Sequence, residues 1–467
     1  MMAGVTVELA RFVASLRFSD LPQSAIEKAR LCVMDAMGCA LAGSRTAEVG
    51  AMMRALERYD RWPPGEGRDL PARAAIWGTA AGATVFTAVL LNGTMTHALE
   101  FDDSLRFAKV HPGAVVIPAA LSLGEIVHVD GKTLITAVAA GYEVMARVGA
   151  ALDPKQHRLR GWHATSTTGT LGAAAAASVI LDLDERRVAY ALGHAGTQSG
   201  GLWAFLADGA MSKKFHPGRA ASSGVLSAIL AAEDLRGATQ ILEAADGGFL
   251  RAFSDRYSEE PVIRDLGTGY AIERVTFKPY PCCRTIHPAV EAVLSIRRQY
   301  GVEPGMVDEV RILTYEVAKV QNGHPGMPKT VTDAQFSMAY CVAAALVAGD
   351  LQLPQFDAGA LSDPRIARLV EKVHVEVAPQ FEAMYPARWP ASAAIKLRNG
   401  KTYEALVETC LGDPEKPLTA EHMKRKFSGM AEAIPRFGTA RFLDAVEKLE
   451  EAHDVSDIVR LVTGDWR

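Results

Sequence analysis

The sequence predicts a mainly α-helical protein, in which an all-helical bundle domain is built from both ends of the chain and a smaller α+β lid domain is inserted between them. Three observations lead to this prediction. Apolar residues recur at helical spacing through the first part of the chain, alternate in a later segment, and return to helical spacing at the end. We therefore assign residues 1–266 and 411–467 to the helical domain and residues 267–410 to the lid.

The first segment begins with an amphipathic helix and is rich in alanine throughout. One predicted helix face carries Leu9, Phe12, Val13 and Leu16, and the next carries Ile26, Ala29, Val33, Ala36 and Met37. The alanine block 173–177 has side chains small enough for helices to approach closely. This part of the chain therefore predicts a compact bundle with several buried helices.

The inserted segment shows the two-residue period of strands around 310–315 and 373–377. A third apolar run leads into Asn399-Gly400 and a fourth leaves it, which predicts a hairpin with a type I′ turn. Helices are expected at about 287–300 and 333–348. The helical pattern then returns with Met423, Phe427, Met430 and Ile434, and this terminal segment is predicted to dock on the first bundle.

Composition narrows the class of protein. The chain has 467 residues, 49% of them hydrophobic, and a formal net charge of -4, so it can bury a large core and has no global field that attracts nucleic acid or an anionic membrane. Its start lacks a basic region, and no run of about eighteen apolar residues occurs, so we predict a cytoplasmic protein. Six scattered cysteines without a C-x-x-C pair predict reduced thiols.

Four stretches concentrate groups that can move protons or bind carboxylates. Two lie in the first part of the chain: residues 92–104 with His111, and residues 161–169 around His163. An acidic cluster is usually a solvated helix cap, and hydroxyls such as those of 165–168 usually cap helices. The alternative for the first stretch is an acid, a hydroxyl and a histidine gathered at the mouth of a pocket. If the hydroxyls of the second stretch do cap a helix, its start would offer NH groups to a carboxylate beside His163.

The other two stretches are residues 208–219, with Lys213 and Lys214, and residues 277–287, with Lys278 and Cys283. A Lys-Lys pair taken alone is typical of a solvated loop, and a proline-rich stretch can be a rigid connector between domains. Clefts between domains are also where ligand pockets form. No nucleotide-binding glycine motif, nucleophile elbow or H-E-x-x-H occurs, and a metal site at Asp102 and Asp103 is a minor alternative.

Together these stretches resemble the MmgE/PrpD family in content, order and spacing. The matching motifs are N-G-x-x-x-H-A-x-[DE]-F-D-D-[ST] with a later H-P, G-[FW]-H-x-T-[ST], D-G-x-x-x-K-x-x-H-x-G, K-x-[YFW]-P-x-C, and D-A-Q-F-S at 333–337. The family includes 2-methylcitrate dehydratase, cis-aconitate decarboxylase and iminodisuccinate epimerase. The resemblance implies a cofactor-independent enzyme without a metal, an inserted α+β lid, and a homodimer.

The resemblance also implies the active-site residues. Carried over position by position, they are Glu100, Ser104, His111, His163, Lys213, Lys278 and Cys283. Glu100 stands where an aspartate is usual, Cys283 stands where the decarboxylase has a histidine, and the spacing to His111 is one residue longer. These departures speak against decarboxylation. The G-W-H and T-S-T residues, the longer spacing, the serine and the cysteine look like the epimerase branch.

Chemistry assigns roles to these groups. Removing a proton next to a carboxylate creates negative charge that must be held by cations and NH donors. We expect Lys213, Lys278 and the helix start with Thr165 and Ser166 to bind carboxylates, and His163 to be the base because imidazole titrates near neutrality. His216 and His287 complete the predicted substrate-binding set.

The second proton-transfer group stays open among Glu100, His111 and Cys283. Protonation of the opposite face of the carbanion gives epimerisation, and protonation of a leaving hydroxyl gives dehydration. We predict a lyase of the 2-methylcitrate dehydratase type acting on a small di- or tricarboxylate. An epimerase, a non-catalytic binding protein that keeps the fold, and a metal-dependent hydrolase are the alternatives.

Overall fold

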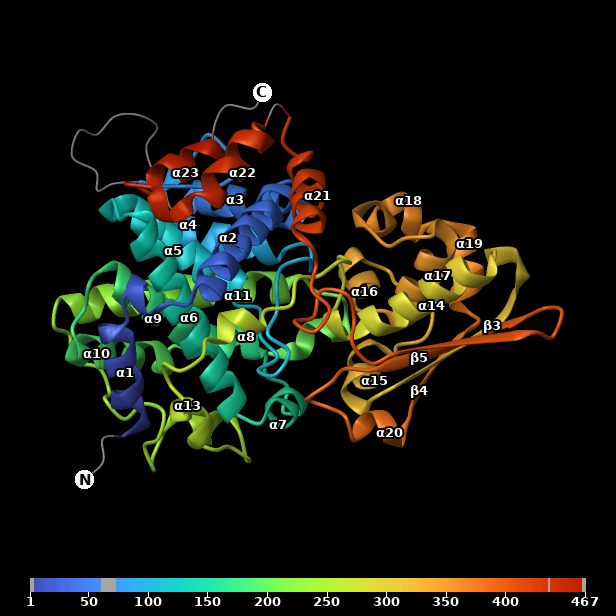
Figure 1. Cartoon of the computed structure of the whole chain (residues 1–467), viewed down its shortest axis with the longest axis horizontal. Helices are drawn as coiled ribbons and strands as arrows, with labels where there is room; N and C mark the ends of the chain where they lie inside the picture. The colour runs from blue at the N-terminus through green and yellow to red at the C-terminus, as the bar shows by residue number, and fades with distance from the viewer. Residues whose placement is uncertain (1–3, 60–72, 436, 464–467) are drawn as a thin grey trace. The chain divides into compact units, whose positions relative to one another are not determined.

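The computed structural model describes residues 4–59, 73–435 and 437–463, and the protein is mainly α-helical, as predicted. The chain folds into two compact units (Figure 1). The first contains Met1–Trp203, Ser212–Thr276 and Thr419–Arg467, and the second contains Ala204–Met211 and Phe277–Leu418. The division after Thr276 and Leu418 lies about ten residues beyond the boundaries drawn from the sequence.

The short segment Ala204–Met211 differs most from the sequence assignment, which placed it in the helical domain. Phe205 packs edge-on against Phe336 with 5.4 Å between the ring centroids, and the Thr330 hydroxyl donates a hydrogen bond to the Gly209 carbonyl at 3.5 Å. Both partners belong to the second unit. The segment therefore packs as part of the second unit, although the residues before and after it belong to the first. The aromatic contact favours this packing because aromatic side chains bury a large area.

The first unit is a helical bundle. Its helices, in chain order, are α1 (Val5–Ser15), α2 (Gln23–Gly43), α3 (Ala47–Tyr59), α4 (Val85–His97), α5 (Gly113–Val127), α6 (Gly131–Ala151), α7 (Pro154–Leu159), α8 (Ala164–Thr167), α9 (Gly169–Ile180), α10 (Glu185–Thr197), α11 (Ser212–Ala232), α12 (Phe249–Phe253), α13 (Glu260–Ile263), α21 (Ala420–Ala431), α22 (Thr439–Glu447) and α23 (Ser456–Leu461). Two short strands, β1 (Ala74–Ala75) and β2 (Gly82–Ala83), pair antiparallel.

The alanine-rich helices form the centre of this bundle. α9 packs against α5, α6 and α11, and α4 packs between α2 and α11. All five residues of the alanine block 173–177 are fully buried. A Cβ on Gly224 of α11 would lie 2.5 Å from Ala173 Cβ, which shows how closely α9 and α11 approach. Small side chains therefore make this core, as the composition predicts.

The second predicted helix face is confirmed, since all five of its residues in α2 are buried. The first is confirmed in part: Leu9 and Val13 of α1 are buried, Phe12 is only half-buried, and Leu16 is buried but follows the end of the helix. The first three residues of the predicted first helix lie outside the described residues. α6 is long and apolar enough to cross a membrane by length and composition, but 94% of its apolar window is buried within the protein. A core helix has the same properties.

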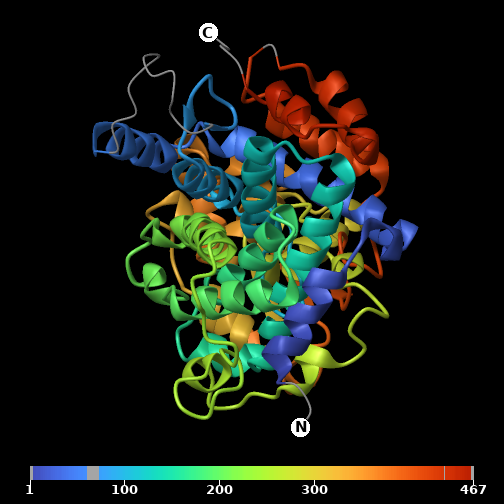
Figure 2. The same cartoon turned by 90° about the vertical axis from the view of Figure 1, so that its left-hand side faces the viewer.

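The C-terminal helices pack on α2, as the sequence predicts. α21 and α22 contact α2, and the end of the chain (red) lies beside the early helices (blue) in both Figure 1 and Figure 2. A Cβ on Gly38 would meet the side chains of Met430 and Phe427 at 2.7 and 2.8 Å. Lys426 of α21 forms a buried ion pair with Asp35 of α2, at 2.6 Å.

The second unit combines a four-stranded sheet with helices. Its elements are α14 (His287–Tyr300), β3 (Val307–Thr314), α15 (Glu316–Asn322), α16 (Val331–Gln335), α17 (Met338–Ala348), α18 (Ala358–Leu361), α19 (Pro364–Val370), β4 (Val373–Val377), α20 (Pro379–Glu382), β5 (Ala391–Leu397) and β6 (Thr402–Val407). The strand order is β4-β3-β5-β6, with β3 and β4 parallel and the other neighbours antiparallel. α14 packs on β5 and β6, and α17 packs on β4.

Two local predictions for this unit need correction. The hairpin of β5 and β6 forms, but among its turn residues only Gly400 has a positive φ, of 84°. The turn is therefore not type I′, which needs two such residues, and Asn399 keeps ordinary backbone. The helix expected over 333–348 is interrupted, because Ser337 caps a new helix by accepting a hydrogen bond from the Tyr340 NH at 3.2 Å.

Candidate active site

The loop that follows α4 carries the first predicted site residues. α4 ends at His97, and Glu100 then has a positive φ of 54°. A left-handed backbone at a residue with a side chain costs on the order of 1 kcal/mol, so it persists only where the surroundings hold it. Here the Glu100 carboxylate forms a buried ion pair with the Lys213 ammonium. The left-handed backbone of Glu100 is therefore found where its carboxylate pairs with Lys213.

Two motif glycines bring Lys213 to this loop. Lys213 lies in the first turn of α11, which packs directly on α4. A Cβ on Gly218 would lie 2.1 Å from the Leu90 carbonyl oxygen, and a Cβ on Gly93 would lie 2.7 Å from Gly218 Cα. Only glycine at both positions allows the helices to approach this closely. The pair places Lys213 opposite His97, whose Nε2 is 2.5 Å from Lys213 Nζ.

The acidic stretch is buried, so its interpretation as a solvated helix cap is wrong. Glu100, Asp102, Asp103 and Ser104 are all less than 5% exposed. Asp102 Oδ2 lies 2.7 Å from His97 Nδ1. Ser104 Oγ is buried and has no hydrogen-bond partner within the described part of the chain. Because a buried hydroxyl without a partner is costly, this atom is suited to bind a ligand.

Asp103 holds His111 in place. Its main-chain oxygen accepts a hydrogen bond from His111 Nδ1 at 2.6 Å. Its carboxylate accepts hydrogen bonds from the Gly113 NH at 2.9 Å and from the Tyr142 hydroxyl at 2.6 Å. Burial raises the pKa of Asp103 to about 7, against the lowering effect of the Tyr142 hydrogen bond. His111 is the more accessible group, with a side chain that is 16% exposed.

His163 lies in the same cluster of histidines. Its ring stacks on His97 with 5.9 Å between centroids and meets Trp203 edge-on at 5.2 Å. Its Nδ1 is 3.1 Å from the Nδ1 of His216. Burial holds the pKa of His163 well below its usual value, and the charge of Lys213 lowers it further. His163 is therefore neutral at pH 7, with a lone pair that can take a proton.

The same causes lower the pKa of His216 to about 4. Two neutral imidazoles whose Nδ1 atoms are in contact must share one proton between these atoms. If His163 donates this proton, its Nε2 carries the lone pair. His216, predicted to bind substrate, is thus in contact with the predicted base.

The hydroxyl groups after His163 do not cap helices, and the expected capping is wrong. α8 has only one turn, its N-cap is His163, and no side chain caps it or α9. Thr168 instead donates to the Ala164 carbonyl at 2.9 Å, while Thr165 Oγ1 accepts from the His111 NH at 3.1 Å. Only Thr168, which has helical backbone, separates α8 from α9, and the anion site expected at this helix start stays a prediction.

The lysine pair is buried rather than solvated. Lys213 is 2% exposed and Lys214 is 3% exposed. Lys214 forms an ion pair with Glu48 of α3, whereas Lys213 pairs with Glu100. Burial of an ammonium group requires a paired carboxylate, and each lysine has one. The interpretation of this stretch as a solvated loop is therefore wrong.

The remaining predicted site residues lie in the second unit. Lys278, Cys283 and His287 are all buried. Cys283 Sγ lies 3.2 Å from Thr285 Oγ1 and accepts a hydrogen bond from Gln321 Nε2 at 3.2 Å. Gln321 is a further polar residue beside Cys283 that the sequence analysis does not single out. That Lys278 faces the same ligand as His163 and Lys213 stays a prediction.

A metal site is the minor alternative, and the structure contains a set of possible ligands. Donor atoms of His97, Asp102 and His111 lie within 4.8 Å of one another. Their residue types can bind a transition metal. However, the Lys213 ammonium lies against His97 Nε2 and would repel a cation there. The same donors hydrogen-bond to protein groups, which supports a metal-independent role.

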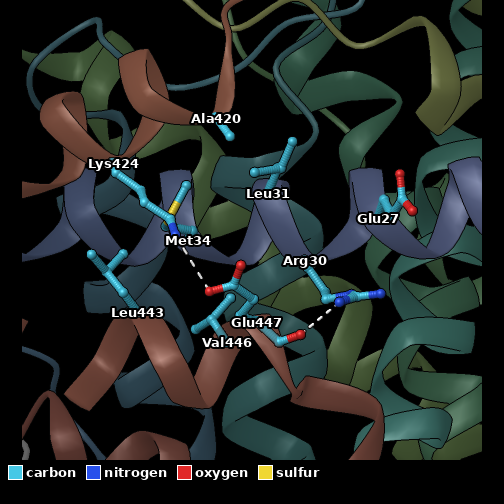
Figure 3. A pocket seen from close by; sticks show the side chains of 9 residues that line it. All are labelled: Glu27, Arg30, Leu31, Met34, Ala420, Lys424, Leu443, Val446 and Glu447. Carbon is cyan, nitrogen blue, oxygen red and sulfur yellow. Dashed lines mark hydrogen bonds and ion pairs between the residues drawn. The ribbon is translucent and has the colours of Figure 1, made fainter. Parts of the chain in front are cut away.

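A surface groove elsewhere in the first unit lacks this chemistry. It lies between α2, α21 and α22 and has a volume of about 320 Å³ (Figure 3). Two of its charged groups contact Glu447: Arg30 donates to the Glu447 carbonyl, and Lys424 contacts the Glu447 carboxylate at 3.4 Å. None of its lining residues belongs to the histidine cluster.

The six cysteines are all buried and free, in agreement with the prediction of reduced thiols. Within the first unit, the structure brings Glu100, His111, His163, Lys213 and His216 into one cluster. It adds His97, to which the sequence analysis gave no role, and Asp102, which the sequence analysis named only for the minor metal alternative. His97 could have been found from its place three residues before Glu100 on the same helical end.

Comparison with known proteins completes the description of the site. The profile of the MmgE/PrpD N-terminal domain matches residues 7–261, and that of the MmgE/PrpD C-terminal domain matches residues 280–451. A cis-aconitate decarboxylase-like protein of Aspergillus oryzae is 29% identical, covering 99% of this chain and 98% of that protein. Cis-aconitate decarboxylase of Mus musculus is 27% identical, covering 99% and 94%. 2-Methylcitrate dehydratase of Escherichia coli (strain K12) is 24% identical, covering 92% and 88%.

Proposed function

The chain belongs to the MmgE/PrpD family, and from this premise we propose that it is a lyase that transfers a proton at the carbon next to a carboxylate of a small di- or tricarboxylate, as in a 2-methylcitrate dehydratase. The relatives that cover nearly the whole chain are enzymes named for cis-aconitate and 2-methylcitrate. One observation carries the proposal: a neutral, buried His163 shares a cluster with a buried lysine cation.

His163 is the proposed base. Burial and the charge of Lys213 hold the pKa of His163 low, so its imidazole is unprotonated at neutral pH. Its lone pair can therefore accept the substrate proton. A proton on His163 Nδ1, donated to His216 Nδ1, would leave Nε2 to attack the substrate C–H. His216 then orients the base, in the way that a hydrogen-bond partner fixes a catalytic imidazole.

Lys213 is the proposed electrophilic group. Loss of the α-proton moves an electron pair onto the adjacent carboxylate, which becomes an enediolate with a second negative charge. A preplaced ammonium stabilises that charge best where water is excluded, and Lys213 is 2% exposed. Glu100 balances the lysine before substrate arrives.

His111 is the proposed second proton-transfer group among the three that the sequence leaves open. Its Nδ1 donates to the Asp103 carbonyl, so proton transfer takes place at Nε2, and Asp102 Oδ2 at 3.5 Å stabilises the imidazolium form. Glu100 is committed to Lys213 and is ionised there. In dehydration, His111 gives its proton to the leaving hydroxyl, and water is released.

An epimerase is the second candidate, supported by the G-W-H and T-S-T residues around His163 and by Cys283. Its two half-reactions need proton donors on both faces of the carbanion, and Cys283 would supply the second. We further propose that the enzyme works in the cytoplasm as a homodimer, without metal or organic cofactor. Light scattering after size-exclusion chromatography measures the dimer directly.

The test is an activity screen of purified enzyme in heavy water, followed by proton NMR. 2-Methylcitrate, citrate, cis-aconitate and iminodisuccinate are supplied separately. Dehydration gives an olefinic product, epimerisation gives deuterium at the α-carbon without net loss of substrate, and decarboxylation gives a product with one carboxylate fewer. The proposal fails if none of the four is consumed or exchanged, which is the outcome expected of a binding protein.

The matched variants are His163→Ala and, as a control, His453→Ala on the surface. We expect the first to lower turnover by about 10² to 10⁴, the usual contribution of a general base. The control is expected to keep wild-type turnover. Near-normal turnover of a folded His163→Ala enzyme would remove this residue from the mechanism.

A further inference from the structure

Asp102, His97 and Lys213 form a continuous hydrogen-bonded line through the core of the first unit. Asp102 Oδ2 is 2.7 Å from His97 Nδ1, and His97 Nε2 is 2.5 Å from Lys213 Nζ. Asp102 and His97 are 0% exposed, and Lys213 is 2% exposed. Neither Asp102 nor His97 touches the substrate in the proposed reaction. Their burial still requires an explanation, because buried polar groups are costly unless they are fully paired.

The two ends of the line determine the proton position on His97. An ionised carboxylate only accepts, so His97 Nδ1 must carry a proton toward Asp102. An ammonium group only donates, so His97 Nε2 must present its lone pair toward Lys213. The opposite tautomer would set a donor against the ammonium and a lone pair against the carboxylate. His97 is therefore neutral, with its proton on Nδ1.

We propose that His97, oriented by Asp102, is a positioning residue that fixes the Lys213 ammonium beside His163. The inference rests on the proposed function for the roles of Lys213 and His163. A carboxylate such as Glu100 can bind an ammonium from several directions, whereas the single imidazole lone pair is directional. His97 thus specifies where the lysine charge lies, and that charge lowers the pKa of His163.

A proton relay would be a different use of the same residues. Transfer of a proton from Lys213 to His97 would form an Nε2–H bond, break an Nζ–H bond, and leave a neutral amine next to an imidazolium. The ordinary pKa values of lysine and histidine differ by about 4, so this transfer is disfavoured by about 10⁴. Glu100 holds the ammonium form further. Lys213 therefore remains an ammonium group, and its hydrogen bond to His97 sets its position.

The decisive experiment compares two substitutions at His97 in the full-length enzyme. His97→Gln places an amide oxygen near the former Nε2 and can still accept from Lys213. His97→Leu has similar volume but no acceptor. We expect kcat/KM to fall about 10- to 100-fold in the leucine variant, the usual cost of removing an orienting partner, and much less in the glutamine variant.

The pH profile separates positioning from mere structure. When Lys213 loses its acceptor and moves, its charge no longer lowers the pKa of His163. The acidic limb of kcat/KM should therefore move to higher pH in His97→Leu and stay near the wild-type position in His97→Gln. His157→Gln, at another buried histidine, is the control that lowers stability without moving this limb. Wild-type profiles in both His97 variants, or equal losses in both, overturn the inference.

A measurement on the resting enzyme tests the inference separately from the reaction. In ¹⁵N-histidine-labelled wild-type protein, His97 should show the chemical shifts of the Nδ1–H tautomer, and His163 should be neutral at pH 7. In Lys213→Met, the His163 resonances should titrate at a higher pH than in wild type. An Nε2–H tautomer or a charged ring at His97 overturns the inference. If wild-type enzyme shows this tautomer but consumes no substrate, only the proposed function has failed.

Discussion

Asp103→Asn tests whether the active-site segment contains an unfavourable buried charge. Burial raises the pKa of Asp103 from 3.8 to about 7, and the nearby carboxylates of Asp35 and Asp102 raise it as well. The Tyr142 and Gly113 hydrogen bonds only partly offset this. A carboxyl whose pKa is raised on folding contributes stability below its unfolded pKa, and that contribution is lost as the pH rises through the folded pKa.

The magnitude follows from the two pKa values. A rise from 3.8 to about 7 corresponds to about 4 kcal/mol, at ~1.4 kcal/mol per pKa unit. Asparagine does not titrate but can still accept from the Gly113 NH. Part of this change lies below pH 4.5 and part above pH 7.5, so the free energy of unfolding of Asp103→Asn, minus that of wild type, should increase by about 3 kcal/mol between pH 4.5 and pH 7.5.

The assay is urea unfolding at several pH values between 4.5 and 7.5, followed by circular dichroism. Contributions from all other titrating groups cancel in the difference between variant and wild type. Asp234→Asn is the control, because the pKa of Asp234 is lowered to about 2 by its hydrogen bonds to arginines, so its difference should stay flat over this range. A flat or falling difference for Asp103→Asn would refute the argument from burial.

Four further outcomes are expected. Lys213→Met should lower kcat/KM by about 10² to 10³, measured by NMR, because the enediolate loses its stabilising cation. It should also lower the free energy of unfolding, because it leaves the buried Glu100 carboxylate without its partner, and adding Glu100→Gln should restore that stability without restoring turnover. Gly218→Ala should destabilise by about 1 to 3 kcal/mol in thermal unfolding, since its Cβ would lie 2.1 Å from a backbone oxygen, whereas Gly429→Ala in α21 meets nothing within 4 Å and should be neutral or stabilising. Burial lowers the pKa of His157 to about 4, so as the pH falls from 6.5 toward 4 the unfolded wild-type chain binds a proton that the folded chain does not, and wild type loses about 3 kcal/mol of stability that His157→Asn keeps; urea unfolding at several pH values measures the difference. Incubation with a chelator should leave kcat unchanged, and loss of activity that zinc restores would instead support the metal alternative.

Several parts of the fold follow directly from local pattern. The buried face of α2, the strands β3 and β4, and the bounds of α14 are all visible as periodicity, and burial alternates from Val310 to Thr314 of β3. Helical and strand periods are properties of a few consecutive residues, so neighbouring sequence is enough to predict them. The break at Ser337 and the backbone of Asn399 were mispredicted, because each depends on one hydrogen bond or one turn geometry within an otherwise regular pattern.

What the sequence by itself determined is the family, the mainly helical class and the set of residues able to do the chemistry. Only the tertiary structure decided which of them act together and in which charge state. His97 and Lys213 are 116 positions apart in the chain, yet their side-chain nitrogens are in contact. Burial and charge proximity set protonation, and both depend on residues far away in sequence. The motif glycines Gly93 and Gly218 are visible in the sequence, but only the structure shows that they allow the close approach of α4 and α11.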